Sequence, residues 1–157
     1  MISVRIFNKV LTVTGRLTST PVQTIPGIVA GAAYASGDAF GEKFSLRVPK
    51  QGVISTFVFI DKDDEGITKE LIILNRDFTA VADNAVFDIS DDSLVNSVGV
   101  IDIDAVDFRD LGSNQIATIT PALWYEAPTG SLYCQFVTRG ADNIAAGSMP
   151  QFFMVIS

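Results

Sequence analysis

The strongest constraint on the fold of this chain is an alternation of polar and apolar residues with a period of two. It runs through Lys43–Val48 and, less strictly, through Ser131–Val137. Successive side chains of a strand point to opposite faces of a sheet, so this alternation predicts half-buried strands. Helical periodicity is nearly missing. One turn of helix is expected at Asp91–Asn96, where the aspartates would suit the positive end of the helix dipole.

Other segments resemble strands in composition. Gly52–Ile60 and Ile67–Leu74 are rich in β-branched and aromatic residues and flank the charged turn Asp61–Gly66, so we predict that they form an antiparallel hairpin. Further strands are expected at Val4–Thr14, Ala85–Ile89, Val98–Ile103, Gln115–Thr120 and Gln151–Ile156. Short strands between frequent turn signals predict an all-β fold, an antiparallel β-sandwich of the jelly-roll kind.

The size and composition of the chain fit one domain with a substantial core. It has 157 residues, of which 48% are hydrophobic and 18% are charged. Such a composition excludes intrinsic disorder, and this length buries a stable core without metals or disulfides. We divide the chain into an N-terminal strand with an arm or long loop at residues 1–33 and a β-sandwich domain at residues 34–157.

The segment at residues 15–42 does not alternate cleanly. It is rich in Thr and Pro at first and in small residues later, and Pro21 and Pro26 exclude a central strand. Two interpretations are open: an extended arm that lies on a partner, or an ordered loop that lies on its own domain. For the arm, the expected partner contacts are Leu17, Thr18, Pro21, Val22, Ile25, Pro26 and Ile28.

Charge and hydropathy exclude several classes of partner. The net charge is −7, which disfavours nucleic acids and anionic membrane surfaces as partners. No apolar run is long enough to span a membrane, and the first residues lack the apolar core of a signal peptide. Synthesis in a reducing cytoplasm is therefore expected, and the single cysteine is consistent with it.

The residues give little support to catalysis. Histidine is absent, which excludes Ser-His-Asp and Cys-His arrangements and His-ligated metals. Cys134 has no histidine to activate it, so it is expected to be a buried apolar side chain. Gly27–Gly31 lacks the Lys-Ser/Thr pair of a phosphate-binding loop. We therefore expect neither an enzyme nor a bound cofactor.

Two acidic clusters require separate consideration. A calcium loop that starts at Asp61 needs a glutamate where Ile72 stands, so Asp61–Gly66 is interpreted as a solvated hairpin tip. Paired carboxylates could serve a glycosidase, or their oxygens could hold calcium. More often such a set is only the solvated face of a sheet. The residues in question are Asp102, Asp104, Asp107 and Asp110.

Three stretches together resemble a known family. Tyr34–Gly41 has the pattern Tyr-x-x-Gly-Asp-x-x-Gly, residues 52–77 contain an aspartate-rich turn followed by Ile-Ile-Leu-Asn-Arg-Asp, and Leu132–Gly140 precedes a final apolar strand. In this order, over residues 34–157, the chain resembles the head decoration, or cement, proteins of tailed bacteriophages. Gly37-Asp38 suits a tight turn, and Gly41 suits a positive φ or a close backbone approach.

The resemblance implies a location and a role. Proteins of this kind are β-rich and lie on the outer surface of the virion capsid. They bind the lattice of the major capsid protein, often as homotrimers, and stabilise the head by noncovalent cross-bracing. No functional residue is carried over from the family.

Two other functions are open. A virion-associated carbohydrate- or receptor-binding β-sandwich is suggested by Trp124 and Tyr125, which could form a sugar-stacking platform, although a core tryptophan at a sheet edge is commoner. A carboxylate-dependent glycosidase is suggested by the aspartates at residues 102–110.

Overall fold

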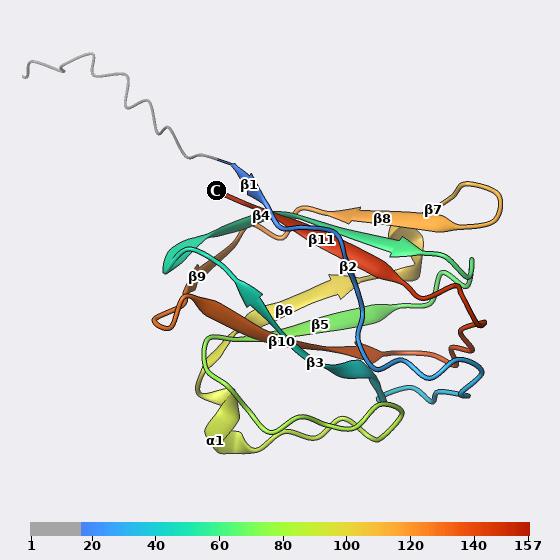
Figure 1. The fold of residues 1–157 in the computed structure, drawn as a ribbon, viewed down its shortest axis with the longest axis horizontal. Coiled ribbons are helices and arrows are strands. Elements are labelled where there is room, and N and C mark those ends of the chain that lie inside the picture. The colour runs from blue at the N-terminus through green and yellow to red at the C-terminus, as the bar shows by residue number, and fades with distance from the viewer. Residues whose placement is uncertain (1–16) are drawn as a thin grey trace, which may run out of the picture.

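The computed structural model describes residues 17–157 as two antiparallel sheets packed face to face (Figure 1). The strand predicted at Val4–Thr14 lies outside these residues. One sheet has the order β1-β11-β4-β8-β7, with β2 also paired to β11 and β9 to β4, and the other has the order β3-β10-β5-β6. The predicted all-β sandwich is confirmed, and the jelly-roll connectivity stays a prediction.

The strands of the first sheet are β1 (Thr18–Ser19), β2 (Gln23–Thr24), β4 (Gln51–Asp61), β7 (Phe108–Asp110), β8 (Gln115–Ile119), β9 (Leu123–Glu126) and β11 (Gln151–Ile156). Those of the second sheet are β3 (Ala39–Arg47), β5 (Lys69–Leu74), β6 (Ser97–Ile103) and β10 (Ser131–Thr138). The expected turn of helix is α1 (Asp91–Leu94), and a 3-10 turn, η1 (Ala105–Asp107), precedes β7.

Phenylalanine side chains fill the space between the two sheets. Phe136 of β10 lies with its ring centroid 5.7 Å from Phe59 and 5.4 Å from Phe152, both from the opposite sheet. Phe57 and Phe40 are fully buried in the same cluster. Large aromatic side chains bury much apolar area, so this cluster contributes strongly to the stability of the sandwich.

The predicted hairpin between residues 52–60 and 67–74 is wrong. β4 pairs with β11, β8 and β9, whereas β5 pairs with β10 and β6 in the other sheet. The turn between them carries the chain from one sheet to the other. The turn is solvated only in part: Lys62 and Asp64 are exposed, whereas the Asp61 side chain is 3% exposed and accepts hydrogen bonds from the backbone N–H groups of Asp63, Glu65 and Gly66.

The strand predicted at Ala85–Ile89 is also absent, apart from one bridge between Asp38 and Val86. Residues 75–96, with α1, instead lie across the outer face of the second sheet, below it in Figure 1. Apolar side chains of this segment pack on those of the sheet: Phe78, Phe87 and Ile89 against Ile72, Leu74, Val137 and Tyr133. The period-two pattern of residues 85–89 therefore reflects packing onto a sheet and not pairing within one.

The buried side chain of Gln135 in β10 fixes this covering segment. It accepts a hydrogen bond from the Val81 N–H at 3.2 Å and donates to the Val81 and Gly41 carbonyls at 2.6 and 3.0 Å. A buried amide with all of these partners holds the covering segment and β3 to one strand.

Residues 17–33 form an ordered edge of the sandwich. β1 and β2 pair with β11, and backbone hydrogen bonds join Thr20 to Met154 and Ile25 to Pro150. Residues 17–33 therefore lie on their own domain, and their contact with a partner stays a prediction. The boundary expected at residue 33 divides two parts that pack together.

Candidate binding surface

The outer face of the first sheet is the candidate site. The core-facing side chains of β4 and β11 include Phe57, Phe59, Phe152 and Met154, so the alternate residues point outward. The register aligns the outward residues in rows across β11, β4 and β8: Phe153, Val58 and Thr118 in one row, and Gln151, Ile60 and Ile116 in the next. Within the described part of the chain, no segment crosses this face as residues 75–96 cross the other (Figure 1).

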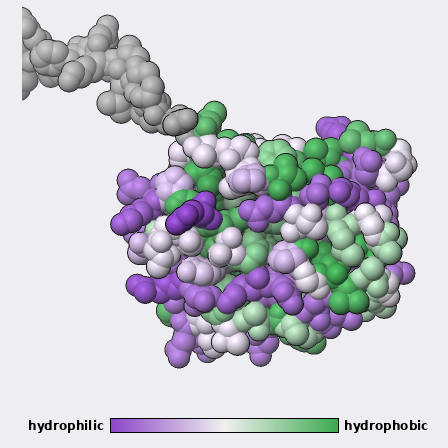
Figure 2. Space-filling model, in the orientation of Figure 1, coloured by the Kyte–Doolittle hydropathy of each residue, from purple (hydrophilic) through white to green (hydrophobic). Residues whose placement is uncertain are grey.

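The outward side chains of this face are mostly apolar and half-buried, with Val58 at 6% exposure and Thr118 exposed, and few of them are charged. Its charged strand residues are Arg109 of β7 and Glu126 of β9, which lie on its flanking strands. Trp124 of β9 points to the same face as Glu126, and it has 60% of its surface exposed. Figure 2, which views the sandwich from the side, shows hydrophobic residues mixed with hydrophilic ones along the upper edge of the molecule. A sheet face of this kind can bind a partner through contact area and shape.

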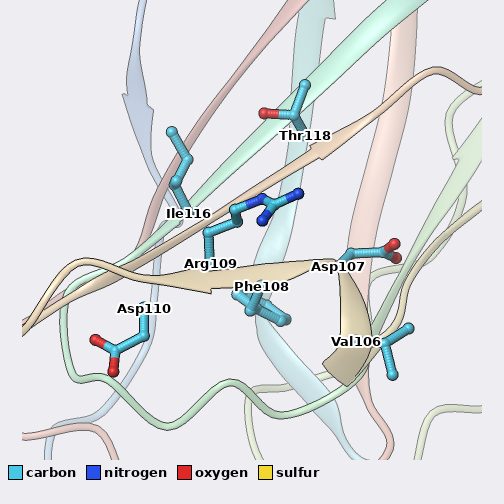
Figure 3. A pocket seen from close by; sticks show the side chains of 7 residues that line it. All are labelled: Val106, Asp107, Phe108, Arg109, Asp110, Ile116 and Thr118. Atoms are coloured by element: carbon cyan, nitrogen blue, oxygen red, sulfur yellow. The ribbon is translucent and has the colours of Figure 1, made fainter.

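An open depression of about 700 Å³ borders this face at β7 and β8. Figure 3 shows Arg109, Ile116 and Thr118 on one side of the two strands, with Phe108 and Asp110 on the other. The guanidinium group of Arg109 is exposed at the edge of the apolar rows. It could form an ion pair with a carboxylate of a bound partner.

The four aspartates of the glycosidase hypothesis do not form one site. Asp102 is exposed on β6 of the second sheet. The Asp107 carboxylate accepts the Asp104 N–H at 2.9 Å in a capping box around η1, and the Asp110 carboxylate accepts the Gly112 N–H at 2.6 Å. These carboxylates therefore shape local turns. No group of metal-binding side chains is found in residues 17–157.

The expected partner contacts are separated by the fold. Leu17 and Val22 have 66% and 56% of their surface exposed, and Thr18 and Pro21 are exposed as well. Pro26 and Ile28 are half-buried. Ile25 is 2% exposed and belongs to the core, so it is not available to a partner. Sequence could not separate these residues, because the segment has no clear alternation.

Trp124 and Tyr125 do not form one stacking platform. They are neighbours in β9, so their rings point to opposite faces of the sheet, and Tyr125 is buried in the core at 1% exposure. Cys134 is fully buried, as expected, and burial raises the pKa of its thiol. Gly27, which begins the glycine-containing stretch, packs with a positive φ against the side chain of Glu42.

The Tyr34–Gly41 pattern has a structural role centred on Asp83. The Asp83 carboxylate accepts hydrogen bonds from the Tyr34 hydroxyl at 2.8 Å and from the backbone N–H groups of Gly41 and Val29 at 2.7 and 3.1 Å. Burial, and then Asp83, raise the pKa of the Tyr34 hydroxyl. Gly37 has φ 98° in the expected turn, and Gly41 has φ 80°. The pattern thus joins the N-terminal segment, β3 and the covering segment.

A buried ion pair was not predicted from sequence. The Lys69 ammonium group lies 2.6 Å from the Asp142 carboxylate, and their side chains are 2% and 0% exposed. Lys69 is one of two charged residues at the start of an otherwise apolar strand, and Asp142 follows in a loop 73 residues later. No local pattern relates them.

Comparisons with protein-family models, with curated proteins and with solved structures found no match for this chain. Among residues 17–157, no helix has the length and apolar character needed to cross a membrane.

Proposed function

We propose that this protein is a bacteriophage capsid decoration protein that binds the major capsid protein lattice through the outer face of its first sheet. The observation that carries the proposal is the asymmetry of the sandwich. The second sheet is covered by residues 75–96, while the outward rows of the first sheet are mostly apolar and have no covering segment among the described residues, with charges only on its flanking strands. The resemblance of Tyr34–Gly41, residues 52–77 and Leu132–Gly140, in this order, to head decoration proteins supports the same function.

The mechanism is noncovalent cross-bracing of the assembled shell. A protein that binds the intact lattice and not its separated subunits stabilises the lattice by mass action. A sheet fixed by a phenylalanine core deforms little, so it transmits strain between the subunits that it contacts. Binding as a homotrimer at local threefold positions would place three copies of the face around one axis.

The test uses capsids that lack this protein, to which the purified protein is added. Co-sedimentation measures binding, and the temperature of DNA release measures stabilisation. We expect binding together with a higher release temperature. Absence of binding, or binding with an unchanged release temperature, contradicts the proposal.

Two variants locate the binding face. Thr118→Lys places a charge at an exposed position of the first sheet's outward rows, on β8 between β4 and β7. Thr79→Lys makes the same change at an exposed position of the covering segment. We expect Thr118→Lys to weaken capsid binding at least tenfold because the lysine would be desolvated in the interface. Thr79→Lys should bind as the unmodified protein does, and equal effects of the two changes exclude this face.

Recognition of a carbohydrate is the second candidate, favoured by the exposure of Trp124 alone. An exposed indole at a sheet face can stack on a sugar ring. A glycan array with the unmodified protein and Trp124→Ala distinguishes the two functions. Glycan binding that is lost in Trp124→Ala would favour this candidate over capsid decoration.

A further inference from the structure

The buried pair of Lys69 and Asp142 has the arrangement required for an amide bond between two side chains. The Lys69 Nζ lies 2.6 Å from Asp142 Oδ1, inside the protein, with both side chains almost fully removed from solvent. The Phe40 ring lies 4.8 Å from the Nζ, and the second oxygen of Asp142 accepts a short hydrogen bond from the Thr138 hydroxyl. The reacting groups are therefore held in contact in one orientation.

We propose that Lys69 and Asp142 condense spontaneously to an intramolecular isopeptide bond, with the Glu65 carboxyl group transferring protons. The inference does not depend on the proposed function. It concerns a covalent modification of this chain by its own residues.

The condensation balances without any other reactant. A proton passes from the ammonium group to the carboxylate, and the neutral Nζ attacks Cγ of Asp142. The Nζ–Cγ bond forms, one Cγ–O bond breaks, and the oxygen leaves as water with two protons that the lysine carried. In solution, water opposes this reaction. Fixed contact between the groups corresponds to an effective concentration on the order of 10⁵ M or more, and the buried site excludes bulk water.

Glu65 is a carboxyl group that lies beside Asp142. Its carboxylate accepts the backbone N–H of Asn143 at 3.0 Å, which holds it beside the neighbouring residue Asp142. The pKa of Glu65 is raised overall, because burial and the negative charge of Asp142 outweigh the lowering effect of the hydrogen bond from the Asn143 N–H. A carboxyl group that keeps its proton to higher pH than usual can protonate the leaving oxygen and then accept the proton from nitrogen.

The bond would have a clear structural effect. Lys69 begins β5 of the second sheet, and Asp142 lies in the connection between β10 and β11, which leads to the first sheet. An amide here would close a loop of 73 residues and fasten this connection to β5. It would also replace two buried charges by a neutral group, which removes the desolvation cost of an ion pair inside the protein.

The intact mass of the purified full-length protein, measured after denaturation, tests the proposal. We expect a mass lower than the sequence mass by one water molecule. Trypsin should fail to cleave the denatured protein after Lys69, and tandem mass spectrometry should find a branched peptide that contains both residues. A folded protein with the full sequence mass overturns the proposal.

Two variants separate this bond from other losses of water. Lys69→Arg keeps the positive charge but cannot form the bond, so it should have its full mass. Lys43→Arg alters a lysine that is 2.5 Å from Asp77 in a more exposed pair, and it should keep the mass deficit. A mass deficit that persists in Lys69→Arg, or one with normal cleavage after Lys69, indicates cyclisation at Asp142-Asn143 and overturns the proposal.

Glu65→Gln tests the proton-transfer role without removing either reacting group. The side chain is half-buried, so the fold should persist, which circular dichroism checks. We expect at least a tenfold slower appearance of the cross-linked mass after refolding. Formation at the unmodified rate excludes Glu65 from the reaction.

Discussion

At the scale of the residue, the ring of Tyr125 stabilises the fold, whereas its buried hydroxyl group destabilises it. Its ring is buried in the core, but within the described residues its hydroxyl oxygen has no hydrogen-bond partner. A buried polar group without a partner loses its bonds to water and gains none in the protein.

Tyr125→Phe removes only this hydroxyl. We expect the free energy of unfolding to be unchanged or to rise by up to about 1 kcal/mol, because no protein hydrogen bond is lost. Chemical denaturation measures it. As a control, Tyr34→Phe removes a hydroxyl bonded to Asp83 at 2.8 Å and should lower stability by about 1–2 kcal/mol. A loss in Tyr125→Phe as large as that in Tyr34→Phe would contradict the assignment of an unpaired hydroxyl.

Gly41 is constrained both by its backbone angle and by its neighbours. It has φ 80°, and a Cβ atom there would lie 2.6 Å from the Pro26 carbonyl oxygen. We expect Gly41→Ala to destabilise the protein by about 2 kcal/mol or more, through strain and a backbone clash. Gly147 has a similar φ of 88° with no atom within 4 Å, so Gly147→Ala should cost only about 1 kcal/mol. Thermal unfolding compares the two, and equal losses would exclude the clash.

At the scale of the element, the covering segment depends on one side chain of β10. The Gln135 side chain forms hydrogen bonds with both the N–H and the carbonyl group of Val81. These bonds take the place of the backbone pairing that a strand would have. The segment has little regular structure of its own, so its order is expected to rest on this amide and on its apolar contacts.

Gln135→Leu keeps the side-chain size and removes the hydrogen bonds. We expect a loss of about 1–3 kcal/mol, since buried backbone groups are left unpaired. Hydrogen exchange of residues 78–90 should become faster, while β4 and β11 keep their protection. Exchange that increases equally in both sheets would show that Gln135 supports the whole sandwich and not the covering segment.

At the scale of the whole molecule, the first sheet is closed at one edge by β1 and β2. Both pair with β11, whose register with β4 continues to Ile156. An uncovered strand edge presents unpaired backbone groups to other chains. The N-terminal strands therefore protect the central strands of the proposed binding sheet.

Deletion of residues 1–24 removes β1 and β2 and should expose the β11 edge. We expect a lower melting temperature together with self-association, measured by light scattering, because β11 can then pair with another copy. Deletion of residues 1–16 retains both strands and serves as the control. If both truncated proteins are equally stable and monomeric, the edge strands do not protect the sheet.

The sequence determined where most strands lie, because the alternation that marks a strand is a property of neighbouring residues. It located β3, β10, β11 and the turn of helix, and it indicated the apolar core. Residues 85–89 show the limit of this inference, since packing of a loop on a sheet produces the same pattern as a strand.

Only the tertiary structure decided which strands pair and which face is open. β4 and β5 are adjacent in sequence but lie in different sheets, because their pairing partners come from distant segments. Lys69 and Asp142 meet for the same reason, at a separation of 73 residues. Pairing and burial depend on contacts across the whole chain, which no local pattern of side chains specifies.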